Sequence, residues 1–205
     1  YLARSMERFP NDAVFQIRKA NRQYVKGDLH GAIATFDEAL GFAQNDTVRG
    51  ELWGYIGDAY HAIADRARLK KLKADTVKAY PVRLSEKAAM KRCYEAYDNA
   101  LKLWSDNVLV LNNYAYFLSL EDRNLEEALQ MSARAIALEP NNATYIDTYA
   151  WILHRLGRNE EAKQYMRQAL SLSSQRDASL LAHYGDILWA LGEKFMAETY
   201  WQKAV

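Results

Sequence analysis

The chain has 205 residues, of which 50% are hydrophobic, 12% aromatic and 26% charged, a balance that excludes a disordered or fibrous chain. Three prolines and nine glycines are too few for the many turns of an all-β sandwich. The net charge of +1 excludes a globally basic or acidic protein, no apolar run is long enough to span a membrane, and the single cysteine, Cys93, cannot form an internal disulfide.

Glycines divide much of the chain into similar pieces. Residues 1–12 hold a first predicted helix, which ends at Phe9–Asp12 and has the character of the second helix of a hairpin. Gly27, Gly157 and Gly192 each follow about 14 residues of helical periodicity and precede another such segment. Because a helix end often needs a residue in the left-handed conformation, the predicted unit is helix, tight turn, helix.

Small residues recur at constant offsets in these helices. The first helices carry Gly57, Ala115, Ala150 and Gly185, and the second helices carry Ala32, Cys93, Ala128, Ala162 and Ala197, followed by Ala39, Ala100, Ala135, Ala169 and Ala204. Small residues let two helices approach closely, while large neighbours fill the gaps. This pattern resembles the tetratricopeptide repeat (TPR) family, whose helical hairpins have about 34 residues. The resemblance covers nearly the whole chain and implies an all-α, right-handed solenoid of antiparallel helix hairpins.

The resemblance places a single array over residues 1–205, with about five repeats after the remnant helix. The predicted repeats are 13–46, 50–107, 108–142, 143–176 and 178–205. In the first repeat, large apolar residues are expected at three positions that hold Gln16, Lys19 and Gln23. A shifted register is the alternative, and it would use Phe15, Ile17 and Tyr24 instead. Both ends of the chain fall inside second helices, so we expect a fragment of a longer protein, or ends that a partner covers.

The second repeat carries an insertion of about 24 residues relative to the ordinary period. Helical sequence continues past Tyr60, is broken by Pro81 and resumes at about Leu84. We therefore expect both helices of this hairpin to extend beyond the solenoid, with Leu69 packing on Leu84 and the neighbours of Met90.

The inserted segment, about 66–92, is strongly basic and is called the basic arm. Its ten bases and two acids give it a charge of +8, so the rest of the chain carries −7. The bases are Arg66, Arg68, Lys70, Lys71, Lys73, Lys78, Arg83, Lys87, Lys91 and Arg92. The arm is either a solvated helical face or a docking site for an acidic partner, an anionic lipid surface or nucleic acid. Nucleic acid is the least favoured, because only Tyr80 offers an aromatic ring for stacking on bases.

In the fold that the resemblance implies, the first helices line a concave groove. The candidate groove residues are Tyr55, Asp58, His61, Asn112, Asn113, Tyr116, Asp147, Trp151, His154, Arg155, His183, Asp186 and Trp189. Asn side chains can bond both the donor and the acceptor of a peptide backbone, and Tyr and Trp are frequent interaction hot spots. For Tyr116, Trp151 and Trp189, packing between adjacent repeats is the alternative. The groove has few Lys and Arg residues, unlike TPR cochaperones that grip a C-terminal carboxylate.

Catalytic and metal chemistry is weakly represented. Asp147, His154, His183 and Asp186 could meet across two repeats as metal ligands or as an acid–base pair. The sequence has no Gly-rich phosphate loop, serine nucleophile elbow or HExxH motif. Cys93 lies in a column of small residues, so we expect an inert buried thiol. The sequence therefore predicts no enzyme, no cofactor and no metal site.

A narrower resemblance lies in Asn113–Leu118, Asp147–Leu153 and His183–Trp189, which are similar to bacterial TPR lipoproteins of the cell envelope. It implies a periplasmic, lipid-anchored adaptor in preference to a cytoplasmic protein; some such relatives hold substrates for envelope proteases. We therefore expect a scaffold or adaptor that binds a peptide or protein segment in the groove. The alternatives are a docking or regulatory domain of a larger envelope enzyme or protease complex, and a binder of anionic surfaces or nucleic acid through the basic arm.

Overall fold

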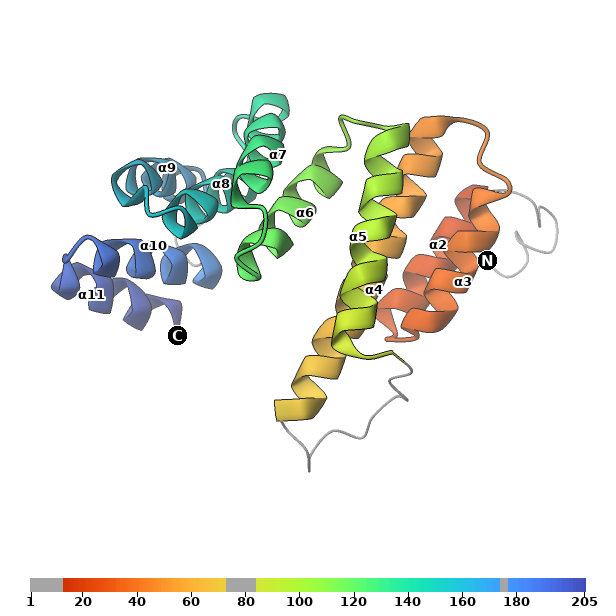
Figure 1. The fold of residues 1–205 in the computed structure, drawn as a ribbon, viewed down its shortest axis with the longest axis horizontal. Helices are drawn as coiled ribbons and strands as arrows, with labels where there is room; N and C mark the ends of the chain where they lie inside the picture. Colours follow the sequence, from red (N-terminus) through yellow and green to blue (C-terminus); the bar gives the residue numbers. More distant parts are fainter. Residues whose placement is uncertain (1–12, 73–83, 174–176) are drawn as a thin grey trace. The chain divides into compact units, whose positions relative to one another are not determined.

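The computed structural model describes residues 13–72, 84–173 and 177–205 (Figure 1). These residues form ten α-helices and no strand, packed as consecutive hairpins in a TPR-like fold, so the predicted all-α class is confirmed. The helices are α2 (Ala13–Val25), α3 (Leu29–Leu40), α4 (Asp46–Leu72), α5 (Glu86–Leu103), α6 (Val108–Leu120), α7 (Leu125–Leu138), α8 (Ala143–Arg155), α9 (Asn159–Leu172), α10 (Ala178–Ala190) and α11 (Lys194–Ala204). None of the described helices is long and apolar enough to cross a bilayer. The chain divides into two compact units, unit 1 (residues 1–107) and unit 2 (residues 108–205).

Unit 1 keeps the ordinary register in its first hairpin. Ala20 is fully buried and Gln16 is 7% exposed, whereas Tyr24 lies at the surface. The amide oxygen of Gln23 accepts a hydrogen bond of 2.8 Å from the hydroxyl of Thr35 on α3. A paired polar side chain is tolerated in such a place. The ordinary register therefore holds, although Ile17 of the shifted register also packs against this core, whereas Tyr24 does not.

The second hairpin of unit 1 is extended, as predicted. α4 has 27 residues, against 13 in each of α6, α8 and α10. Ile63 and Ala64 of α4 form a buried cluster with Ala89 of α5, and Ala67 is also buried. Leu69 is 46% exposed, so its predicted packing on α5 is wrong. It stands two residues after Ala67, about 200° further around the helix, and so faces away from the seam.

Part of the predicted basic arm lies outside the described structure. This applies to Lys73, Lys78, Tyr80, Pro81 and Arg83, and to the side chains of Lys71 and Leu72.

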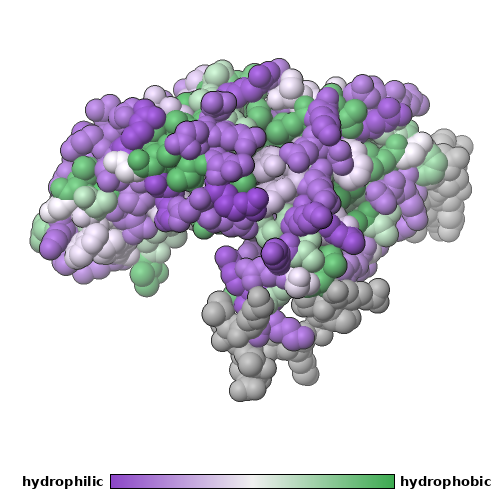
Figure 2. All heavy atoms as spheres, in the orientation of Figure 1, coloured by the Kyte–Doolittle hydropathy of each residue, from purple (hydrophilic) through white to green (hydrophobic). Residues whose placement is uncertain are grey.

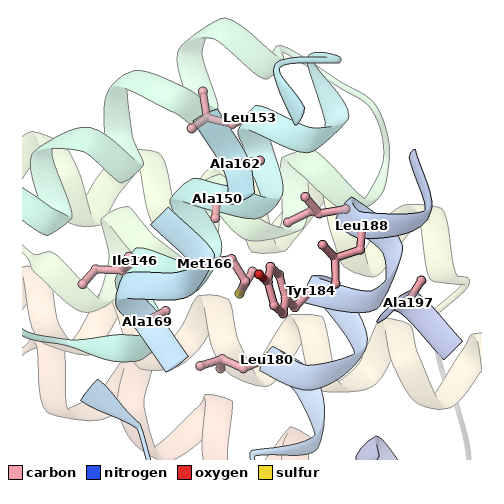
Figure 3. Packing of buried hydrophobic residues seen from close by; sticks show 11 residues of the cluster. Ile146, Ala150, Leu153, Ala162, Met166, Ala169, Leu180, Tyr184, Leu188 and Ala197 are labelled. Atoms are coloured by element: carbon pink, nitrogen blue, oxygen red, sulfur yellow. The ribbon is translucent and has the colours of Figure 1, made fainter. Parts of the chain in front are cut away.

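Unit 2 consists of the hairpins α6–α7, α8–α9 and α10–α11. Its core joins Ile146 and Leu153 of α8, Met166 of α9, and Leu180 and Tyr184 of α10 (Figure 3). The predicted small columns are confirmed in both units as fully buried residues. They include Ala32, Ala39, Cys93, Ala100, Ala115, Ala128, Ala135, Ala150, Ala162, Ala169 and Ala197.

The turns between hairpin helices use the left-handed conformation. Gly27, Gly157 and Gly192 have φ of 84°, 77° and 81°, which confirms their predicted role. After each glycine, the next amide donates to the carbonyl five residues earlier, closing the helix end in a Schellman arrangement. The longer α6–α7 turn has no glycine and instead places Asp122 (φ 51°) and Asn124 (φ 46°) in this region.

Candidate functional site

The helices α6, α8 and α10 of unit 2 are neighbours, and one side-chain cluster links them. Nδ1 of His183 on α10 lies 2.9 and 3.1 Å from the two carboxylate oxygens of Asp147 on α8. The same imidazole stacks on the indole of Trp151 at a centroid distance of 4.3 Å and an angle of 23°. The ring of Tyr116 on α6 lies 6.2 Å from it. We call this surface, together with Asn112 and Asn113, the α6–α8–α10 face.

The centre of this face is buried between the helices. Asp147 is 6% exposed and Trp151 is 8% exposed, whereas Tyr116 and His183 are partly exposed. Trp151 is therefore part of the packing between repeats. Because a carboxylate only accepts hydrogen bonds, Nδ1 of His183 donates to Asp147, which leaves Nε2 as an acceptor in the neutral imidazole.

Two buried polar atoms on the face have no hydrogen-bond partner among the described residues. They are Oδ1 of Asn112, whose side chain is 5% exposed, and Nε1 of Trp151. The amide nitrogen of Asn112 is used, because it donates to Oδ1 of Asn113 at 3.3 Å. A buried polar group without a partner costs about 1–3 kcal/mol. Both atoms are shielded from solvent, so the packing of the helices leaves one acceptor and one donor unused.

Two of the candidate groove residues close the C-terminal end of α8. The guanidinium of Arg155 donates from Nε to Oδ1 of Asp122 at 3.0 Å, pairs with the second carboxylate oxygen, and lies 5.6 Å from the Trp151 ring centroid. The hydrogen bond from Arg155 lowers the pKa of the Asp122 carboxyl. Nδ1 of His154 lies 2.7 Å from Oδ1 of Asn159. The Arg155 side chain therefore ties the end of α8 to the α6–α7 turn, and the His154 side chain ties it to the start of α9.

In unit 1, the candidate Asp58 supports the core. It accepts a hydrogen bond of 2.5 Å from the hydroxyl of Tyr97, a fully buried residue of α5. The ring of Tyr97 lies against Gly57, where an added Cβ would come within 2.4 Å of it. Burial, and then the charge of Asp58, raise the pKa of Tyr97 well above its ordinary value.

The remaining unit 1 candidates also have local partners within that unit. The ring of Tyr55 stacks on Phe36 at 5.4 Å, and burial raises the pKa of the Tyr55 hydroxyl. Nδ1 of His61 lies 3.5 Å from a carboxylate oxygen of Asp65, one helical turn away.

The same glycine–aspartate–aromatic arrangement recurs in the last hairpin of unit 2. The indole of Trp201 lies on Gly185, within 2.4 Å of an added Cβ, and donates from Nε1 to Asp186 at 3.0 Å. Trp189 lies 5.5 Å from Trp201 and is 45% exposed, and the ammonium of Lys194 lies 5.2 Å from its ring centroid. Tyr97 and Trp201 are not among the candidate groove residues. The sequence does contain a signal for them, because each of these two hairpins has Gly–Asp in its first helix and a large aromatic residue in its second helix.

The residues considered for a metal or acid–base site do not form one cluster. The structure joins Asp147 with His183, while His154 binds an asparagine of α9 and Asp186 binds Trp201. Within the described ranges, no three His, Cys, Asp or Glu side chains are grouped so as to hold a metal ion.

Two bases of the basic arm are docked on the body of unit 1. Nη1 of Arg66 donates to the carbonyl of Gly27 at 2.7 Å, and so ties α4 to the α2–α3 turn. The guanidinium of Arg92 lies 5.7 Å from the ring centroid of Tyr60 and donates to its hydroxyl at 3.3 Å. The exposed bases of the described arm, besides Arg92, are Arg68, Lys70, Lys87 and Lys91. The inclusion of Arg66 in a projecting arm is therefore wrong.

Comparisons with known proteins agree with this architecture. Residues 143–176 match the model of the tetratricopeptide repeat. No curated protein matches the chain. Among solved structures, MamA (41-end) from Desulfovibrio magneticus RS-1 superposes with a TM-score of 0.67 at 16% identity, covering 94% of this chain and 92% of that chain. YrrB, described as a TPR protein with an unusual peptide-binding site, gives 0.63 at 17% identity, covering 100% and 90%. PilF of Pseudomonas aeruginosa gives 0.62 at 22% identity, covering 94% and 74%. At these identities the likeness shows the fold.

Proposed function

We propose that the chain is a non-enzymatic scaffold that binds a protein segment along the α6–α8–α10 face. The observation that carries the proposal is the row of partly exposed side chains on this face, Asn113 and Tyr116 of α6 and His183 of α10. An Asn side chain offers both a donor and an acceptor to a peptide main chain. TPR proteins act as protein-interaction scaffolds, and the peptide-binding site named for YrrB supports this use of the fold.

The dimensions of the face favour a segment of chain as the ligand. Packed helices lie about 8–10 Å apart, so a row across three of them is about 20 Å long. An extended segment of about six residues spans that distance. Tyr116 and His183 are the partly exposed aromatic rings along this row, and both supply contact area with few rotatable bonds to immobilise.

Peptides selected from a random library displayed on phage provide the ligand for a direct test. Asn113→Ala and Tyr116→Ala change side chains that are partly exposed on the face, and each should weaken binding by about fivefold or more, the loss of about 1 kcal/mol typical of a contributing residue. Gln130→Ala on the exposed surface of α7 is the control and should leave affinity unchanged. Chemical-shift mapping that places the selected peptides on α7 and α9 would contradict the proposal.

The same binding activity is compatible with a docking or regulatory domain of a larger envelope enzyme or protease complex. A location in the bacterial cell envelope, with a lipid anchor, is part of the proposal and rests on the resemblance of Asn113–Leu118, Asp147–Leu153 and His183–Trp189 to envelope lipoproteins. An N-terminal lipidation signal in the full reading frame, with membrane fractionation of the native protein, tests this location.

A second candidate function is binding of an acidic partner or an anionic lipid surface through the basic arm. It is favoured by the exposure of Lys70 and Lys87 near the adjoining ends of α4 and α5. Exposed bases attract anionic surfaces over roughly one Debye length.

A further inference from the structure

The last helix of unit 2 begins with large apolar side chains in solvent. Phe195 is 80% exposed and Met196 is 43% exposed. Across the α10–α11 turn, Trp189 is 45% exposed, and Lys194 covers one side of its ring at 5.2 Å. The part of unit 2 visible in Figure 2 is largely hydrophilic, with hydrophobic residues showing in small groups. We call Trp189, Phe195 and Met196 the apolar tip.

The other second helices of unit 2 show that the fold does not require apolar residues here. Phe195 and Met196 stand two and one positions before the buried small residue Ala197. The equivalent pairs are Glu126 and Glu127 before Ala128, and Glu160 and Glu161 before Ala162, and these glutamates lie at the surface. Acids in the first turn of a helix interact favourably with its dipole. In α11 the acidic pair is replaced by an apolar pair, of which Phe195 lies mostly in solvent and Met196 is half-exposed.

A further stacked hairpin would not cover these positions either. α7 is followed by the hairpin α8–α9, and α9 by α10–α11, and yet the glutamate pairs of α7 and α9 stay at the surface. A hairpin stacked on α10–α11 in the same way would therefore leave Phe195 and Met196 in solvent.

The area of the tip decides what kind of partner can cover it. An aromatic side chain buries about 150–250 Å², so two facing copies of this partly covered tip fall well short of the roughly 1,200–2,000 Å² of a stable interface. A second copy is therefore not held by the tip alone. The tip can only add to a contact that is made elsewhere on the partner.

The tip continues the α6–α8–α10 face along α10. His183, Asp186 and Trp189 follow one another at a spacing of three residues, so each lies next to the following one along a ridge that winds about 120° around α10 from His183 to Trp189. From His183 to Trp189 the helix rises about 9 Å, which about three extended residues cover.

We infer that the apolar tip is the second contact of the segment bound on the α6–α8–α10 face, an inference that rests on the proposed function. The segment crosses the face, passes along α10 and places apolar side chains on Trp189, Phe195 and Met196. Trp and Met are enriched at interface centres, and Met adapts its shape to irregular partners. The bound segment also carries an acidic residue next to its apolar side chains, and this residue forms an ion pair with Lys194.

The experiment uses peptides of about 12 residues, selected from a random phage-displayed library against the full chain; about ten extended residues span both contacts. We expect an enriched apolar pair flanked by Asp or Glu. The double variant Phe195→Glu/Met196→Glu should weaken the selected peptides tenfold or more and leave the urea midpoint unchanged, because it copies the residues of α7 and α9. The matched control, Glu160→Gln/Glu161→Gln, should leave affinity unchanged. Lys194→Glu should weaken peptides with the acid, and replacing that acid by Lys should restore affinity.

The two levels of the proposal fail differently. Peptides that lose affinity with Tyr116→Ala but not with Phe195→Glu/Met196→Glu overturn the inference and leave the proposed function standing. Peptides that lose affinity with the tip variant but not with Tyr116→Ala contradict the binding role of the α6–α8–α10 face and its continuity with the tip. A wild-type dimer in sedimentation velocity that the double variant abolishes would assign the tip to a second copy. Flotation with phosphatidylcholine vesicles that requires Phe195 would assign it to lipid, and a selection without any binder overturns both levels.

Discussion

Replacement of Gly57 by alanine tests the packing between the helices of the extended hairpin. The new Cβ would come within 2.4 and 2.5 Å of Cε1 and Cδ1 of Tyr97, whereas carbon atoms in contact are separated by about 3.5–4.0 Å. The ring cannot withdraw easily, because Tyr97 is fully buried and its hydroxyl is fixed to Asp58 by a hydrogen bond of 2.5 Å.

The magnitude follows from three contributions. Overpacking a core costs about 1–3 kcal/mol, while alanine gains about 1 kcal/mol over glycine in a helix. The net loss is therefore about 0–2 kcal/mol if the ring shifts and keeps its bond to Asp58. If the bond breaks, a hydrogen bond to a charged group worth about 1.5–3 kcal/mol is lost as well, which brings the total to about 1.5–5 kcal/mol.

A double-mutant cycle separates this clash from any general intolerance of Gly57. In α8 and α9, Ala150 stands opposite the fully buried Met166 and the pair packs in the same core cluster. Tyr97→Met copies that pair into the extended hairpin. In this background Gly57→Ala should be neutral or stabilise by up to about 1 kcal/mol, because the helix-propensity gain remains and the flexible thioether adapts.

Urea unfolding followed by circular dichroism on the four proteins of the cycle gives the coupling free energy. If Gly57→Ala changed stability by the same amount in the wild-type chain and in the Tyr97→Met background, the reasoning would be refuted. Gly185→Ala, whose Cβ would come within 2.4 Å of Trp201, provides an independent repetition in unit 2.

Three further predictions concern pH, the exposed lysines of the basic arm and the docked Arg66. Tyr97 has a pKa raised well above 10.0, so its stabilising effect is complete below the unfolded pKa of about 10 and is lost as the pH rises further. Urea midpoints should therefore stay level from about pH 7 to 9 and fall above pH 10, by up to about 1.4 kcal/mol per pH unit for this group, with a smaller fall in Tyr97→Phe; an identical fall in both proteins would contradict this. For the arm, Lys70→Glu/Lys87→Glu should abolish flotation with phosphatidylserine vesicles at low salt and change stability by about 0.5 kcal/mol or less. Arg66→Ala should instead destabilise unit 1 by about 1.5–3 kcal/mol, because the Gly27 carbonyl loses its charged donor; equal melts of Arg66→Ala and Lys70→Ala would show that this bond contributes nothing.

Packing within each hairpin was predictable from residue size. Ala128 and Ala162 are fully buried, and Gly157 has the positive φ expected of a helix end. The extension of α4 was predictable from the continuing helical sequence. These features are local, because they depend on the spacing of residues within about 34 positions.

The contacts between successive first helices were not predictable in the same way. His183 meets Asp147 across 36 residues, and this pairing depends on how far one hairpin is displaced along the next. Repeat spacing places both residues near one face but does not decide whether they bond each other or a ligand. The burial of Trp151 follows from the same displacement, because His183 covers its ring.

The apolar tip shows how a candidate binding residue can be recognised in the sequence of a repeat protein. When each repeat is compared with its siblings, a residue that the fold requires recurs, as Ala162 and Ala197 do. A residue that departs from its siblings at an exposed position is instead free of the fold, and selection for binding can act on it alone. Phe195 meets this condition, since its counterpart in the preceding hairpin is Glu160, a charged residue at the surface. Trp151 does not meet it as cleanly, because its side chain is buried and contributes to packing. For this reason a substitution at Phe195 reports on binding with little change in stability, whereas one at Trp151 changes both together.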